Sequence, residues 1–116
     1  MCVNGARWVR TDVLEAHPKA DLRVYAVWFN MMASDSREKW RDKLLSDRRV
    51  AHFWDESKTV GSWFGERTPK HDILWDAWML YGADATWTDE PSGLVGTGRT
   101  IMASRDALKA AIDRLF

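Results

Sequence analysis

The sequence predicts an α/β fold in which helices cover a mixed sheet. Residues 21–30 place apolar side chains on both faces of one strand, which is typical of a sheet with helices on both sides. Predicted helices separate the early strands, and such crossovers join parallel strands. Two late strands joined by a short turn predict an antiparallel pair. The sheet is therefore expected to be mixed, with about four strands.

Composition limits the class of protein. A chain of 116 residues predicts a single domain over 1–116, and 46% hydrophobic with 29% charged residues is ordinary globular composition. The net charge is zero and no Lys/Arg cluster stands out, which argues against nucleic acid and anionic membranes as partners. Arg7 and Arg10 interrupt any secretory signal, and the run Val24–Phe29 is far shorter than the ~20 residues of a membrane span. We expect a cytoplasmic protein.

The first predicted helix covers residues 4–16, with Asn4 as its N-cap and Pro18 ending it. Its apolar stripe consists of Ala6, Val9, Val13, Leu14 and Ala16. The strand over 21–30 follows. One face of that strand carries Leu22, Val24, Ala26 and Trp28, and the other carries Tyr25, Val27 and Phe29.

A second helix is predicted from Asp35, because Glu38 completes a capping box and Trp40, Leu44 and Leu45 form an inner face. Residues 49–55 predict a strand with alternating faces. Val50, His52 and Trp54 point one way, and Ala51 and Phe53 point the other. Asp55 or Ser57 is expected to start a third helix, whose apolar face is Val60, Trp63 and Phe64 and whose C′ residue is Gly65.

Residues 72–81 fit a buried strand and also a helix, and we predict a strand because the turn 82–84 follows. Another strand is expected over 94–103, loosened by Gly96 and Gly98. Ser104 is the predicted N-cap of the last helix, with Asp106 in its first turn. The apolar stripe of this helix is Leu108, Ala111, Ile112 and Leu115.

Few residues suggest chemistry by their spacing. His17, His52 and His71 have no paired spacing that would bind a metal, and Gly96-Thr97-Gly98 lacks the rest of a dinucleotide fingerprint, so we expect neither metal nor cofactor. The eight tryptophans indicate either a bulky core or a ring-stacking surface. Arg23 and Asp76 interrupt apolar strands, so each needs a partner or an exposed position, and they could face each other.

The order of elements, with Cys2 ahead of the first helix, resembles the thioredoxin-like superfamily, and most closely an uncharacterised bacterial branch with an inserted helix and strand. The resemblance covers almost the whole chain and rests on residues 23–28, 50–55, 60–65, the late strand pair and 104–108. It implies a relation to thiol-disulfide oxidoreductases. Family members begin with a strand that leads into Cys-x-x-Cys, whereas this sequence opens at Met1-Cys2.

The resemblance places Cys2 at the position of the second, resolving cysteine. It implies that the chain is truncated at its N-terminus and lacks the first family strand and the attacking cysteine. Because Cys2 is the only cysteine, a two-thiol cycle cannot close, and we expect mixed disulfides with protein thiols at most. In the family the first strand lies between the equivalents of residues 21–30 and 72–81. Without it these strands pair directly or leave unpaired edges, which favour self-association.

Two functions remain open from the sequence. One is a thioredoxin-fold protein related to thiol-disulfide oxidoreductases that is redox-inactive or acts through Cys2 alone. The other is a non-catalytic binding or scaffold domain that uses a tryptophan-rich surface.

Overall fold

The computed structural model describes residues 2–29 and 45–116, and these fall into two compact units. Unit 1 combines Met1–His17 with Asp76–Phe116, and unit 2 is Pro18–Trp75. The described residues contain both helices and strands, so the α/β class is confirmed. The helix predicted from Asp35 lies outside the described residues, apart from Leu45, its last predicted position.

The helical part of unit 1 differs from the prediction at its start. Helix α1 spans Cys2–Trp8 and continues directly as the π-helix η1, Val9–Leu14. Asn4 therefore lies inside α1, and its prediction as the N-cap is wrong. The wider turns of η1 are visible in the bond from the Glu15 N–H to the Arg10 oxygen, five residues back, at 2.9 Å.

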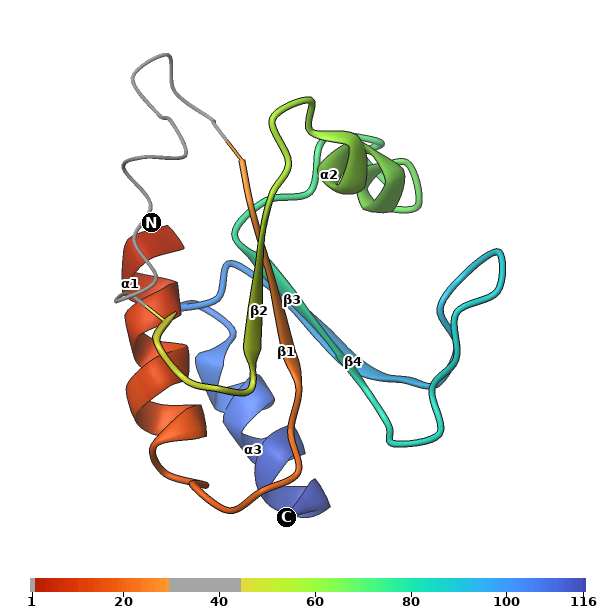
Figure 1. Cartoon of the computed structure of the whole chain (residues 1–116). Coiled ribbons are helices and arrows are strands. Elements are labelled where there is room, and N and C mark those ends of the chain that lie inside the picture. Colours follow the sequence, from red (N-terminus) through yellow and green to blue (C-terminus); the bar gives the residue numbers. More distant parts are fainter. Residues whose placement is uncertain (1, 30–44) are drawn as a thin grey trace. The chain divides into compact units, whose positions relative to one another are not determined.

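The antiparallel hairpin of unit 1 is confirmed. Strand β3, Ala77–Tyr81, pairs with β4, Leu94–Arg99 (Figure 1). In their register Trp78 lies opposite Gly98. Both strands are shorter than predicted. β3 begins only at Ala77 because Asp76 adopts a left-handed φ of 49°, which is incompatible with an extended strand.

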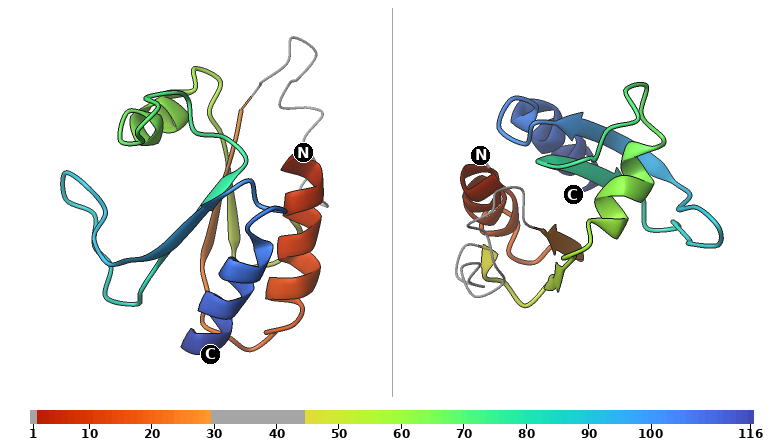
Figure 2. Two further views of the ribbon diagram at one scale, coloured as in Figure 1. Left: turned by 180° about the vertical axis from the view of Figure 1, so that it is seen from behind. Right: turned by 90° about the horizontal axis from the view of Figure 1, so that it is seen from above.

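The core of unit 1 forms where the helices cover one face of the hairpin. Helix α3, Arg105–Leu115, lies side by side with α1 in both views of Figure 2. Leu14 and Ile112 are almost fully buried, at 0% and 2% exposure. The other buried apolar residues of unit 1 are Ala6, Val13, Trp78, Leu80, Leu108 and Ala111. The predicted core positions Ala16 and Leu115 are exposed instead, because they lie beyond the last covered turn of each helix.

The two glycines of β4 form a flat surface for the Trp78 indole. A Cβ on Gly96 would lie 3.4 Å from the Trp78 ring, and one on Gly98 only 2.6 Å from the Trp78 Nε1. That Nε1–H donates to the Ser104 Oγ at 2.8 Å, and the Ser104 hydroxyl in turn donates to the Thr100 oxygen. Ser104 precedes α3 as predicted, but its side chain makes no capping bond to the helix. Gly96 and Gly98 thus have a packing role.

We expect Gly98→Ala to destabilise the protein by about 1–3 kcal/mol, because a methyl group there displaces both Trp78 and Ser104. Urea unfolding followed by far-UV circular dichroism measures this loss. Gly96→Ala is the matched control, since its methyl group meets the same ring at an ordinary contact distance of 3.4 Å. Equal losses for the two variants would contradict the assigned packing.

Unit 2 contains the predicted parallel pair. Strand β1, Val24–Trp28, runs parallel to β2, Val50–Trp54, with Val24 opposite Val50 and Trp28 opposite Trp54. The alternation over both segments therefore predicted the strands correctly, and their parallel direction agrees with the expectation of a crossover connection.

Helix α2 of unit 2 spans Thr59–Gly65 and begins close to the prediction. Lys58 occupies the N-cap position, so neither Asp55 nor Ser57 is the N-cap residue. The Asp55 carboxylate nevertheless accepts from the N–H groups of Thr59 and Val60 at 2.9 and 2.7 Å and so satisfies the first donors of α2. Gly65 is the last residue inside the helix, so its prediction as C′ is wrong. It is required there because a Cβ would overlap the Asp72 backbone.

The sheet differs from the predicted four-stranded one. Among the described residues β1 pairs with β2 and β3 pairs with β4, which gives two sheets of two strands each. The expectation that both faces of β1 are covered is also wrong at one position. Tyr25 is 71% exposed, so the face of β1 that carries it is largely open to solvent at this position.

Candidate functional site

Cys2, the one site residue predicted from the sequence, is the first residue of helix α1. It is the only cysteine of the chain, so an internal disulfide cannot form. In thiol chemistry it could attack a disulfide and remain as a mixed disulfide, but no second thiol of this chain could resolve that product.

The described part of the chain brings together no group of three or more His, Cys, Asp or Glu side chains that could hold a metal ion. Each of the three histidines has a separate role. His71 is exposed in the segment after α2, with a left-handed φ of 53°. His17 and His52 take part in structural hydrogen bonds.

His52 joins the two strands of unit 2. Its Nδ1 accepts from the Trp28 Nε1–H at 3.0 Å, and the two rings stack at 6.2 Å. Because the indole nitrogen can only donate, Nδ1 carries no proton, and Nε2–H is left to donate to the Leu45 oxygen at 3.2 Å. Both ring nitrogens are therefore used, and His52 is held as a structural residue.

His17 holds the end of the first helix to the last one. Its Nδ1 lies 3.0 Å from the Val13 oxygen and its Nε2 lies 3.1 Å from an Asp113 carboxylate oxygen. Asp113 also lies 3.5 Å from the Lys109 Nζ within α3. These contacts fasten two helices of unit 1 and leave no nitrogen of His17 directed at an open site.

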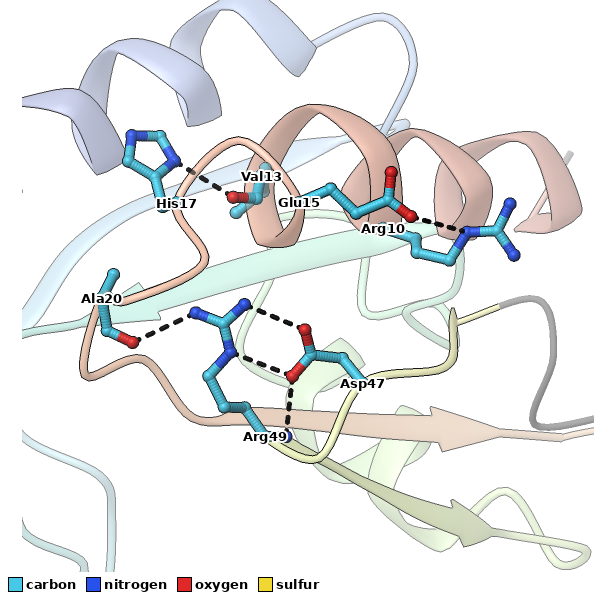
Figure 3. A network of polar contacts seen from close by, with 7 residues as sticks. All are labelled: Arg10, Val13, Glu15, His17, Ala20, Asp47 and Arg49. Carbon is cyan, nitrogen blue, oxygen red and sulfur yellow. Dashed lines mark hydrogen bonds and ion pairs between the residues drawn. The ribbon is translucent and has the colours of Figure 1, made fainter.

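The strongest polar cluster of unit 2 is the pair Asp47 and Arg49, just before β2 (Figure 3). The Arg49 Nε–H and one terminal N–H each donate to a different Asp47 oxygen at 2.9 Å, which is the bidentate geometry. A further terminal N–H of Arg49 donates to the Ala20 oxygen at 3.1 Å. One guanidinium thus fixes the segments that lead into β1 and β2.

The contacts between Asp47 and Arg49 shift the pKa values of both side chains. The Arg49 side chain, followed by its backbone N–H, lowers the pKa of Asp47 from 3.8 to about 2, because these donors favour the carboxylate. Asp47 raises the pKa of Arg49 in the same way. Burial raises the pKa of Tyr81. Each of these shifts has its cause in contacts or burial within the fold.

The two charges predicted inside strands lie outside them. Arg23 is exposed immediately before β1, which agrees with the exposed-position alternative. Asp76 precedes β3, and its carboxylate accepts from the Ile101 N–H at 3.3 Å.

Exposed aromatic side chains are the clearest surface feature. Tyr25 and Phe53, from neighbouring strands, are 71% and 51% exposed, and their rings stack at 6.4 Å. In unit 1, Trp87 is 61% exposed in the loop between β3 and β4. Trp78, in contrast, is buried, so the tryptophans of the described residues serve both the core and the surface.

The structure identifies the class of the chain, a small protein of mixed α/β type with two short sheets. Comparisons with family models, with curated proteins and with solved structures give no match. In the described part of the chain no helix has both the length and the apolar character needed to cross a membrane.

Sequence reasoning missed the two polar clusters of unit 2. The alternation placed Trp28 and His52 each on one strand face but gave no register between the strands. For Asp47 and Arg49 the only sequence signal is the i,i+2 spacing of opposite charges before a strand.

Proposed function

We propose that the chain is a thioredoxin-fold protein related to thiol-disulfide oxidoreductases, and that it reacts through Cys2 alone. The order in which strand pairs follow one another along the chain supports this proposal. A parallel pair precedes an antiparallel hairpin and a last helix, as the resemblance implies. The position of Cys2 at the start of the first helix agrees with the same resemblance.

In the proposed reaction the Cys2 thiolate attacks a disulfide. A new S–S bond forms between Cys2 and one sulfur, and the other sulfur leaves as a thiolate. With no second cysteine in the chain the product stays a mixed disulfide until an external thiol attacks it. Each chain therefore reacts with one disulfide at a time, and a further cycle requires an external thiol to release Cys2 from the mixed disulfide.

The test compares the reaction of the folded and the urea-unfolded chain with glutathione disulfide, followed by intact mass spectrometry. A redox role predicts one glutathione per chain and a rate at least about tenfold higher in the folded state at neutral pH, since folding must favour the thiolate. Cys2→Ser, the control, takes up none. A rate in the folded chain that does not exceed the unfolded one contradicts the redox role.

The second candidate is a non-catalytic binding domain. The exposed aromatic residues Tyr25, Phe53 and Trp87 favour it, because large rings left in water are typical of binding surfaces. The kinetic comparison above separates the two candidates, since a binding domain requires no enhanced reactivity at Cys2.

A further inference from the structure

The sheet of unit 2 has the hydrogen-bonding capacity for another strand. In an extended strand, successive residues direct their N–H and C=O groups to alternate edges. The Val24 N–H donates to the Arg49 oxygen at 3.0 Å, and the Trp28 oxygen accepts from the Asp55 N–H at 2.6 Å. Residues 24 and 28 thus turn toward β2, and Tyr25 and Val27 turn toward the opposite edge of β1. Among the described residues no strand pairs with that edge.

A parallel sheet of only two strands is an incomplete structural element. Such sheets normally have further strands and cover on both faces. Edge strands that avoid pairing carry lysine, proline or a bulge. The segment Val24–Trp28 has no lysine or proline, and its register with β2 is regular from end to end. In contrast, β4 pairs with β3 through an irregular register near Tyr81.

We propose that β1 pairs with β1 of a second copy of this chain across a two-fold axis at Ala26. A two-fold axis makes the strands antiparallel. In this register all residues of β1 overlap, and Tyr25 of one copy lies opposite Val27 of the other. These are the two residues whose backbone groups point to this edge, so they exchange paired hydrogen bonds. The result is a continuous sheet in the order β2–β1–β1–β2.

The side chains fit this register. Each Tyr25 meets a Val27, an aromatic and β-branched pair of the kind that stabilises sheets. Arg23 lies opposite Phe29, so no like charges oppose each other between residues 23 and 29. Tyr25, which is 71% exposed, becomes partly covered. A contact of this length buries less than the roughly 1,200 Å² of a stable interface, so we expect a weak dimer that dissociates on dilution.

Cysteine crosslinking tests the register. In a Cys2→Ser background, Ala26→Cys places two thiols opposite each other on the axis, at a non-hydrogen-bonded pair with Cα atoms about 4.5 Å apart, which a disulfide spans. Val24→Cys is the matched control on the same strand face, where the two thiols are about 13 Å apart along the strands. Mild oxidation at high concentration is expected to give covalent dimers for Ala26→Cys only. Equal yields at both positions, or none at Ala26, would overturn the proposal.

Sedimentation equilibrium of the Cys2→Ser chain measures the same association without a crosslink. Tyr25→Lys is expected to raise the Kd about tenfold, because it removes the Tyr–Val pairs and brings two cations near the axis. Phe53→Lys removes a ring that is 51% exposed from β2, one strand further from the axis, and leaves the Kd within about twofold. A monomer at every concentration, or a larger effect at Phe53 than at Tyr25, rejects the dimer. Circular dichroism confirms that each variant is folded.

Discussion

Replacement of Leu14 by alanine is expected to lower the free energy of unfolding by about 2–5 kcal/mol. Leu14 has no exposed surface and is one of the two largest fully buried side chains among the described residues. Its truncation removes apolar contacts and leaves a cavity between the helices and the hairpin of unit 1. Ile112→Ala should cost a similar amount, since Ile112 is 2% exposed in the same core.

Leu115→Ala is the matched control for this substitution. Leu115 lies at the end of α3 and is 46% exposed, so little apolar surface returns to water and no closed cavity forms. Its expected cost is below about 1 kcal/mol. Chemical denaturation of the three variants checks the difference. A loss at Leu115 as large as that at Leu14 would show that the packing of unit 1 differs from the structure.

Patterns within one segment predicted the elements of this chain well. The two-residue alternation of 49–55 gave β2, and the stripe of Leu108, Ala111 and Ile112 gave the buried face of α3. The predicted length of a strand was wrong where one backbone dihedral angle determines where the strand begins. The apolar pattern of 72–81 continues through Asp76, but its left-handed φ of 49° confines the strand to the second half of the segment.

Features that depend on distant residues could not be derived from such patterns. Gly96 and Gly98 suggested a loose strand, whereas they accommodate Trp78 from the neighbouring strand. Tyr25 follows the apolar alternation of β1, but exposure depends on what packs against that face, and alternation contains no such information. For the same reason the sequence placed Cys2 ahead of a helix but did not define any partner for its sulfur.

Arg49→Ala should cost about 3 kcal/mol, the second large effect we expect. The side chains of Arg49 and Asp47 are only 9% and 18% exposed. Removal of the guanidinium leaves the Asp47 carboxylate with only the backbone N–H of residue 49 as donor and removes the Arg49 hydrogen bond to the Ala20 oxygen. Arg48→Ala is the control, since Arg48 is the adjacent, exposed arginine, and it should cost less than about 0.5 kcal/mol. Similar losses at both positions would contradict a structural role for the pair.

The same pair predicts how stability depends on acid. Asp47 has a pKa of about 2 in the folded chain against 3.8 ordinarily, so between these values the unfolded chain binds more protons than the folded one. The stabilisation, about 2 kcal/mol, is complete above the ordinary pKa and is lost as the pH falls toward 2. Asp47→Asn cannot titrate, so its deficit relative to wild type should be constant above about pH 5 and shrink in acid. Urea unfolding of both proteins from neutral to acidic pH measures that deficit, and a deficit independent of pH would show that Arg49 does not hold Asp47 ionised.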